Sequence, residues 1–403
     1  MTQTRREFLG AVSATAAWAS LPMPSGTRSI DDPLGVRPDF PVTERLVYLD
    51  GAYITPSPRQ AVAAARSFIE AKAEEPISLG GMLEETNATR RRFARLVNAS
   101  EPEIGMLFAT SDGENIVARA LDLGAGDNVV IDDLHYETTY LLYQQLEASH
   151  GLEVRVVDSV GGRAAAADFE PHVDARTRLV SVAWVSHQNG YRHDLKSLAD
   201  LAHSRGAYLY ADAIQGLGAV DLDVRAADVD FLTAGTYKWL LGGYGVAPFY
   251  VREELLELIQ PDRYGSLQVV DEIGEHHYSI HNDGRKYGYA TLGFGAVYQL
   301  GAALDYLLAV GVPNIERHTA GLAHRLRDGL VAQGYDVWTP ADNTSPIVAF
   351  DHRRDVDRVR SDLERAGVKV SLKEGGTQIR AGIALFNNSD EVDALLAVTR
   401  SWA

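Results

Sequence analysis

One of the six lysines in this sequence lies where a lysine is not expected. Lys238 stands in "DFLTAGTYKWLLGGYGVAPFYV" (230–251), on a glycine-rich connection between two apolar runs that are typical of strands. The other five lysines lie in polar, helix-like or loop-like surroundings. A strongly hydrated ammonium group is usually exposed, so a lysine between two apolar runs indicates chemistry, such as a covalent bond to a carbonyl carbon.

Other reactive side chains lie at the ends of predicted strands. Asp212 ends one apolar run, His187 ends another, and His135 and Tyr136 follow a third. In an open parallel sheet, ligands bind outside the carboxyl ends of the strands. These side chains are therefore expected to meet Lys238 in one site.

One chemistry uses this whole set, namely that of pyridoxal phosphate. Lys238 would form a Schiff base with the cofactor aldehyde, and a buried Asp212 would keep the pyridine nitrogen protonated. Ser111, Asp112 and Gly113 precede a predicted helix in "ATSDGENIVARAL", where backbone amides could bind a phosphate. Taken singly, each has a simpler explanation: a solvated lysine, a turn aspartate and a helix N-cap.

The elements that position these residues alternate between strand and helix from about residue 46. Short, nearly continuous apolar runs are typical of strands covered on both faces, and helix-like segments such as 137–151 and 194–206 separate them. The pattern predicts an α/β fold with a large, doubly wound, mostly parallel sheet. The predicted strands are 128–133, 153–159, 178–186, 207–213, 230–235 and 246–251.

After about residue 295 the pattern changes to that of a small C-terminal α+β domain. The sequence thus predicts an N-terminal arm (28–45), a large domain (46–295) and a small domain (296–403). The predicted elements of the small domain are helices 295–311, 314–334, 355–367 and 389–402 and strands 346–351, 368–372 and 378–385.

The N-terminus reads as an export signal. The order Thr-Arg-Arg-x-Phe-Leu, followed by a short apolar stretch, resembles the twin-arginine (Tat) signal, so residues 1–27 are assigned to a signal peptide. This predicts passage through the Tat translocon to the periplasm or the medium. Whether the signal is cleaved stays open.

Composition excludes several classes of function. A formal charge of −17 argues against nucleic-acid and anionic-membrane partners, which need basic patches. The chain has no cysteine, so disulfides, thiolate metal sites and a cysteine nucleophile are excluded. No metal site is predicted, because the twelve histidines show no ligand spacing.

Three motifs together resemble those of the class V aminotransferase family of fold-type I pyridoxal-phosphate enzymes. This family includes cysteine desulfurases, kynureninases and isopenicillin N epimerase-like proteins. "YLDGAYITPSP" (48–58) is similar to its opening motif, "YADAIQGLGAV" to its Asp–Gln strand end, and "TYKWLLGGYGVAPFYV" to its Schiff-base segment. The resemblance runs from about residue 48 to residue 396 and implies a fold-type I PLP-transferase.

The resemblance also implies roles for individual residues. The substrate is expected to be an α-amino acid or a peptide-linked amino acid, bound by a homodimer with shared active sites. Lys238 would form the Schiff base, Asp212 would contact the pyridine nitrogen and Gln215 the ring hydroxyl. Ser111, Asp112, Gly113 and Thr236 would bind the phosphate, His135 or else Tyr136 would stack on the ring, and His187 would face the cofactor. Thr291 would reach the phosphate of the neighbouring subunit, Arg380 would bind the substrate α-carboxylate, and Ala52 would contact the substrate.

Departures from the family leave the reaction open. With no cysteine to carry a persulfide, the common cysteine desulfurase mechanism is not expected, and Tyr237 stands where much of the family has histidine. His187 replaces a frequent asparagine and Asp112 a frequent threonine. The expected activity is aminotransferase-type, with an epimerase (His187 or Tyr136 as the second acid) or a lyase as alternatives.

Two other classes of protein fit the sequence less well. An exported binding protein on a retained scaffold would have no use for Lys238. A nicotinamide dehydrogenase would need a GxGxxG loop soon after its first strand, and none opens a helix here.

Overall fold

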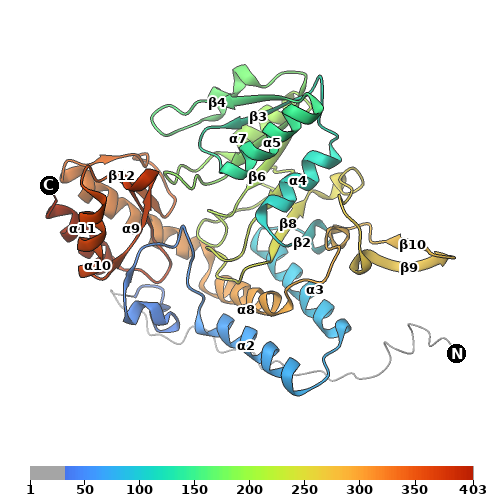
Figure 1. Ribbon diagram of the computed structural model, residues 1–403, viewed down its shortest axis with the longest axis horizontal. Helices are drawn as coiled ribbons and strands as arrows, with labels where there is room; N and C mark the ends of the chain where they lie inside the picture. The colour runs from blue at the N-terminus through green and yellow to red at the C-terminus, as the bar shows by residue number, and fades with distance from the viewer. Residues whose placement is uncertain (1–31, 403) are drawn as a thin grey trace.

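A seven-stranded sheet forms the centre of the larger part of the molecule (Figure 1). The computed structural model describes residues 32–402, so the predicted signal, 1–27, and the start of the predicted arm lie outside the described residues. The strand order is β2-β8-β7-β6-β5-β3-β4. The strands are β2 (Ile104–Leu107), β3 (Asn128–Asp132), β4 (Glu153–Val157), β5 (Thr177–Ala183), β6 (Tyr208–Asp212), β7 (Phe231–Thr233) and β8 (Ala247–Val251).

The sheet is mostly parallel, which confirms the predicted fold class. Neighbours among β3, β4, β5, β6 and β7 pair in parallel, whereas β8 runs antiparallel to both β7 and β2. The six predicted strands correspond to β3–β8, and β2 was not predicted. β2 contains Gly105 and only one β-branched residue, so its sequence lacks the pattern typical of a strand.

Helices cover both faces of the sheet. On one face, α4 (Thr110–Ala120) and α5 (Glu137–His150) pack over a core that contains Val129, while α7 (Leu195–Ser204) packs on the other face, over Val130. Successive residues of a strand point to opposite faces, so a strand covered on both sides must be apolar throughout. A short helix, α6 (Ala166–Phe169), precedes β5.

A helical layer lies beside the sheet, as Figure 1 shows for α2 (Arg59–Glu74), α3 (Leu79–Leu96) and α8 (Phe294–Val310). α8 packs against both α2 and α3, and is followed after a bend by α9 (Val312–Ala332). Within residues 32–402, no single helix is long and apolar enough to cross a membrane; α8 and α9 pass that test only as a pair, bent by 77°. The predicted domain boundary at 295/296 stays a prediction.

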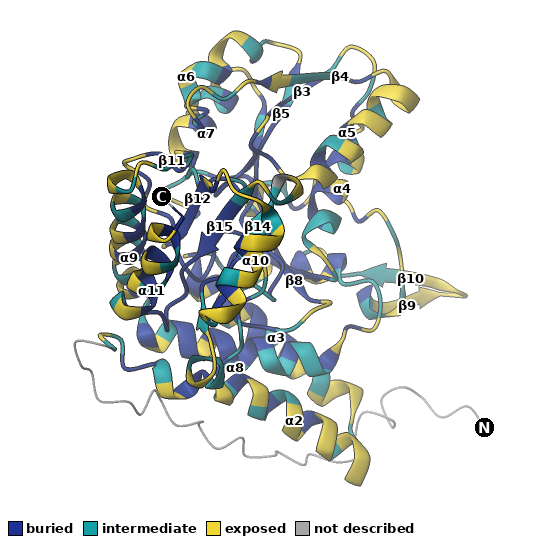
Figure 2. Cartoon of the chain, turned by 60° about the vertical axis from the view of Figure 1, so that its left-hand side comes forward, coloured by how far each residue is buried: buried dark blue, intermediate teal, exposed yellow. Residues whose placement is uncertain are grey.

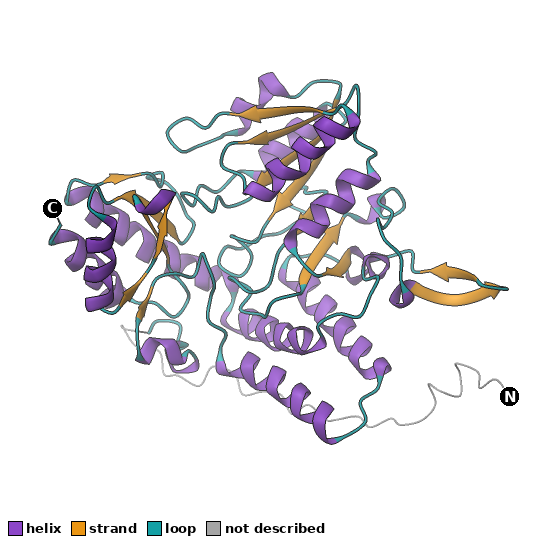
Figure 3. Ribbon diagram, in the orientation of Figure 1, coloured by secondary structure: helices purple, strands orange, loops and turns teal. Residues whose placement is uncertain are grey.

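The C-terminal part contains a four-stranded antiparallel sheet in the order β11-β12-β15-β14, visible beside its helices in Figure 3. Its core includes Leu326, Phe350 and Leu395, which α9, β12 and α11 contribute. The remaining elements are β11 (Asp336–Val337), β12 (Ile347–Asp351), α10 (Val356–Arg365), β13 (Val368–Lys369), β14 (Ser371–Lys373), β15 (Gln378–Gly382) and α11 (Ser389–Arg400).

The segment before α2 joins the C-terminal part to the large sheet. β1 (Val47–Tyr48) pairs in parallel with β13, and Asp50 forms a bridge with Gly382 at the end of β15. A hairpin of β9 (Val269–Gly274) and β10 (His277–Ile280) projects from the opposite side and is largely exposed (Figures 1 and 2). The joining segment matters for the site because it brings Ala52 beside the strand ends.

Candidate active site

A cavity of about 270 Å³ lies at the carboxyl ends of β5, β6 and β7. This is the end of a parallel sheet at which ligands are expected. The cavity collects residues from five separate stretches of the chain. Its lining comprises Phe108, Ala109, Thr110, Ser111, Glu114, Tyr136, Thr138, Ala183, Val185, His187, Tyr210, Asp212, Ile214, Gln215, Gly235, Tyr237, Lys238, Tyr244, Gly245 and Val246.

Lys238 lies on the connection between β7 and β8 and lines this cavity. Within the described part of the chain its Nζ forms no hydrogen bond or ion pair, and it lies 5.9 Å from the ring centroid of Tyr237. Burial and, to a smaller extent, the positive charge of Arg380 together lower the pKa of Lys238 to about 8. The amine is therefore more nucleophilic at neutral pH than an exposed lysine.

Asp212 is the last residue of β6 and is buried. Its Oδ1 accepts a hydrogen bond from the backbone N–H of Ile214 at 3.0 Å, which fixes the side chain at the strand end. Burial raises the pKa of Asp212, while the charges of His135 and Lys238 oppose that rise. The Asp212 carboxylate and the Lys238 amine thus lie close enough for their charges to interact.

Gln215 connects the cavity to the segment before α2. Its Nε2 donates to the carbonyl oxygen of Ala52 at 2.9 Å, and its Oε1 accepts from Nε1 of Trp239 at 3.1 Å. Ala52 is fully buried and contacts Gln215 through its backbone. Its predicted contact with substrate stays a prediction.

His135 is buried behind the cavity, and Tyr136 lines it. The His135 Nδ1 accepts from the Tyr136 backbone N–H at 2.8 Å, so a neutral ring carries its proton on Nε2, 3.3 Å from Oγ of Ser181. The Ser181 hydroxyl donates in turn to Glu114 at 2.5 Å. Of these two residues predicted to stack on a cofactor ring, Tyr136 lines the cavity and His135 does not, and the stacking role stays a prediction.

His187 lines the cavity and packs edge-to-face against Tyr136, with ring centroids 5.1 Å apart. Burial, together with the smaller effect of the Lys373 charge, lowers the pKa of His187 to about 3. The imidazole is therefore neutral at physiological pH, and its Nδ1 is buried without a hydrogen-bond partner among residues 32–402.

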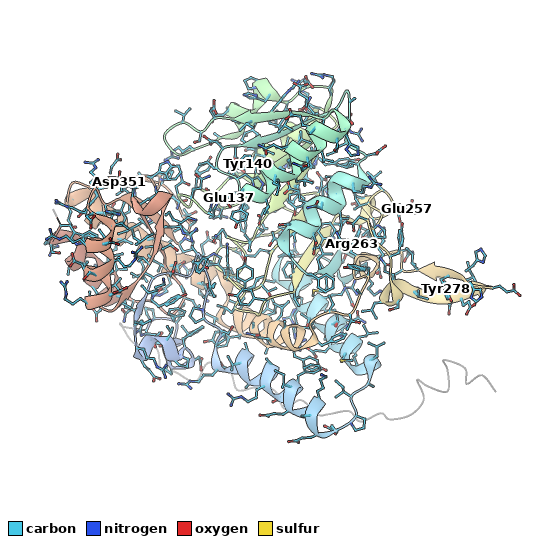
Figure 4. All side chains as sticks on the ribbon, viewed as in Figure 1. Glu137, Tyr140, Glu257, Arg263, Tyr278 and Asp351 are labelled. Atoms are coloured by element: carbon cyan, nitrogen blue, oxygen red, sulfur yellow. The ribbon has the colours of Figure 1, made fainter. Side chains whose placement is uncertain are left out.

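The predicted phosphate segment divides into lining and supporting residues. Ser111 lines the cavity at the start of α4, whereas the Asp112 carboxylate turns back to accept from the backbone N–H groups of Phe108 and Ala109 at 3.2 and 3.1 Å. Arg263, labelled in Figure 4, has its Nη1 3.6 Å from Asp112. The Asp112 carboxylate is thus held by the two backbone N–H groups that precede α4 and by the Arg263 guanidinium.

Gly113 and Thr236 have packing partners of their own. A Cβ at Gly113 would lie 1.9 Å from Oγ1 of Thr233, so its missing side chain lets α4 pack closely on β7. The Thr236 hydroxyl donates to the carbonyl oxygens of Gly243 and Val246, at 2.6 and 3.1 Å. Neither residue lines the cavity, and their phosphate roles stay predictions.

Arg380 lies in β15 and is buried beside the cavity. Its Nη1 donates to the carbonyl oxygen of His187 at 2.7 Å and its Nη2 to Oγ of Ser371 at 3.3 Å. Its Nε is buried without a partner within the described residues. Thr291, in contrast, is exposed on the segment before α8, outside the cavity.

Five polar residues that line the cavity were not predicted from the sequence: Thr110, Glu114, Thr138, Tyr210 and Tyr244. Thr110 and Glu114 flank the predicted phosphate-binding residues 111–113, and Tyr244 lies in the glycine-rich stretch after Lys238. Their positions next to predicted residues were the available signal. The Thr110 Oγ1 accepts from the Gly235 backbone N–H at 2.9 Å, which ties α4 to the lysine segment.

These residues fit pyridoxal phosphate. The cavity joins an amine with a lowered pKa to a buried carboxylate, with neutral aromatic side chains between and the start of α4 at one end. Lys238 would hold the cofactor covalently, Asp212 would contact its pyridine nitrogen, and Ser111 would contribute to the phosphate end. Arg380, held next to the cavity by the His187 carbonyl oxygen, would bind the carboxylate of the substrate.

Comparisons with known proteins agree with this site. The model of the aminotransferase class-V family matches residues 47–395. A probable cysteine desulfurase of Methanothermobacter thermautotrophicus is 30% identical over 384 residues, which cover 89% of this chain and 95% of that protein.

Solved structures share the fold. The apo cysteine desulfurase of Thermococcus onnurineus NA1 has a TM-score of 0.84 at 23% identity, covering 93% of this chain and 99% of that one. A C-DES mutant with glycine covalently linked to its pyridoxal phosphate cofactor has a TM-score of 0.84 at 19% identity, covering 91% and 99%. The chain belongs to the aminotransferase class-V family and is a pyridoxal-phosphate-dependent enzyme.

Proposed function

We propose that this enzyme cleaves the carbon–sulfur bond at Cβ of a cysteine-derived amino acid by α,β-elimination. The curated relative described above bears the name probable cysteine desulfurase, which supports sulfur chemistry. The observation that carries the proposal is a lysine–arginine site in a chain without cysteine. No residue of these 403 can accept sulfur as a persulfide, so the sulfur leaves with the released product.

The residues divide the work of elimination. Arg380 binds the α-carboxylate, since its fork of N–H donors suits a carboxylate. Lys238 removes the proton from Cα, and bound pyridoxal phosphate supplies the electron sink for the pair left behind. The Cβ–S bond then breaks and its electrons leave with sulfur. The overall reaction consumes water and releases a thiol, pyruvate and ammonium.

The state of His187 argues against epimerisation. That reaction needs an acid on the face opposite Lys238, and a histidine with a pKa of about 3 is neutral at neutral pH and therefore a very weak acid. Burial raises the pKa of Tyr136 above that of an ordinary phenol, so it is also a weak acid. Transamination remains the second candidate, because it needs only the lysine base and the family includes aminotransferases.

Product analysis tests the proposal. Holoenzyme is incubated with cysteine, cystine and S-alkyl cysteines, and with amino donors plus 2-oxo acids. Pyruvate and thiol in equal amounts support elimination. Alanine with release of sulfur to an added thiol indicates desulfuration, and a 2-oxo acid matched to the donor indicates transamination; either would overturn the elimination proposal. A colourless protein after cofactor addition would favour the exported binding protein instead.

The lowered pKa of Lys238 predicts how cofactor loading depends on pH. Only the free amine attacks the aldehyde, so the rate of covalent incorporation into apoenzyme should rise with pH through about 8 and then level off. In Arg380→Gln the midpoint should move upward, because loss of a nearby positive charge favours the ammonium form. Stopped-flow absorbance between about pH 6 and about pH 10 measures both midpoints. A wild-type midpoint near that of an exposed lysine would contradict this.

We also propose that the enzyme is exported and works as a homodimer. The Thr-Arg-Arg-x-Phe-Leu order at the N-terminus supports export by the Tat translocon to the periplasm or the medium. The exposed position of Thr291, away from its own cavity, is compatible with a contact to a neighbouring subunit's phosphate. Cell fractionation tests the first statement, and light scattering with Thr291→Ala kinetics tests the second.

A further inference from the structure

A second cavity, of about 460 Å³, lies beside the first. It is formed between the segment after β1, strands β13 and β14, and α10; Figure 2 shows β14 and α10 close together. Arg380 connects the two cavities. Its side chain lines the second, while its Nη1 donates to the carbonyl oxygen of His187, which lines the first.

The second cavity is basic in a strongly acidic chain. Four basic side chains line it, against two acidic ones. Lys369 lies 3.6 Å from the buried Asp50, whose other oxygen accepts from Ser371. The bases are Arg360, Lys369, Lys373 and Arg380, and the acids are Asp50 and Glu364. In a chain of formal charge −17, this local excess of positive charge favours an anionic ligand.

Lys373 lies close enough to act on both cavities. It ends β14 and lines the second cavity, and its positive charge lowers the pKa of both His187 and Lys238 in the first. At Arg380, the buried Nε has no hydrogen-bond partner within residues 32–402. A ligand that extends from the first cavity past Arg380 would therefore meet a cation and an unused donor.

We propose that the second cavity binds an acidic group on the part of the substrate beyond Cβ. The substrate would then be an α-amino acid with two anionic groups, the α-carboxylate on Arg380 and a carboxylate or similar anion beside Lys373. This rests on the proposed function, since the group beyond Cβ is there the leaving group. The proposal predicts that amino acids with a small, neutral leaving group are not the preferred substrates.

Binding of a matched ligand pair tests the subsite without turnover. L-2-aminoadipate and its 6-amide have nearly the same shape, differ by one negative charge and carry no leaving group at Cβ. Each is titrated into holoenzyme and followed by the absorbance of the cofactor. Wild type should bind the acid about tenfold or more tightly than the amide. In Lys373→Gln that preference should fall to about twofold or less, with binding of the amide unchanged.

Controls separate the subsite from other effects. Lys72→Gln, on the exposed side of α2, makes the same change in net charge and should keep the wild-type preference. Unchanged binding of the amide shows that Lys373→Gln is folded, and Lys369→Gln provides a second variant. Equal binding of acid and amide by wild type would overturn the subsite, as would equal weakening of both ligands in Lys373→Gln.

The two proposals can fail separately. A preference for the acid that depends on Lys373, together with no pyruvate from any cysteine derivative, would keep the subsite and reject the elimination. Pyruvate formation with no acid preference would reject the subsite and keep the elimination.

Discussion

Replacing Lys238 with alanine is expected to lower turnover about 10³-fold or more, because one change removes both the covalent link to the cofactor and the proton acceptor at Cα. The wild type should show a visible cofactor band that borohydride bleaches while fixing the cofactor to the chain. Lys238→Ala should bind the cofactor without fixing it. Mass spectrometry of the reduced proteins measures the link directly.

Lys238→Arg separates the amine from its charge. Arginine keeps a positive charge beside Asp212 but stays protonated and cannot bond to the aldehyde. It should therefore be as inactive as Lys238→Ala, and Lys72→Ala should match wild type. Turnover of Lys238→Ala within about tenfold of wild type would contradict the assignment of Lys238 as the base.

The fold could be predicted because strand and helix patterns alternate clearly and each pattern has a local physical cause. Strands covered on both faces must be apolar throughout, and α5 stops just before Gly151, whose φ of 72° suits glycine. The packing of α8 against α2 and α3 has no such local signal. It depends on which apolar surfaces meet after the chain has folded.

The site shows the same division. Asp212, His187 and Lys238 could be grouped from the sequence because each follows a recognisable strand, and the carboxyl ends of parallel strands share one edge. The partners of Asp112 and Thr236 could not be foreseen. The Asp112 carboxylate caps its own helix, and the Thr236 hydroxyl bonds two carbonyl oxygens of the following loop. Such choices between a ligand and a nearby backbone group are settled by the tertiary arrangement.

The long-range contacts of the segment before α2 were the hardest to predict from the sequence. Asp50 and Ala52 precede the large sheet in sequence, yet Asp50 pairs with Lys369 and Ala52 contacts Gln215. The pairing of β1 with β13 brings them there across more than 300 residues. No periodicity in the sequence reports a contact of that range.

Asp212→Asn is expected to lower turnover about 10²-fold or more without unfolding the protein. A carboxylate stabilises a protonated pyridine nitrogen, and an amide of the same shape cannot. Asparagine keeps an oxygen that can accept from the Ile214 backbone N–H, now at 3.0 Å, so the end of β6 should stay in place. Burial makes the charge effect large, since little water reaches the carboxylate to screen it.

Two comparisons decide whether the charge of Asp212 is the cause. Asp133→Asn changes an exposed aspartate just after β3, which β5 separates from β6 in the sheet, and should leave turnover unchanged. Asp212→Ala also removes the acceptor for Ile214 and should melt at a lower temperature than Asp212→Asn, with turnover at least as low. Steady-state kinetics and thermal melts of the four proteins provide the data. Turnover of Asp212→Asn close to wild type would show that the pyridine nitrogen works without this charge, and Asp212 would then be a residue of strand-end structure alone.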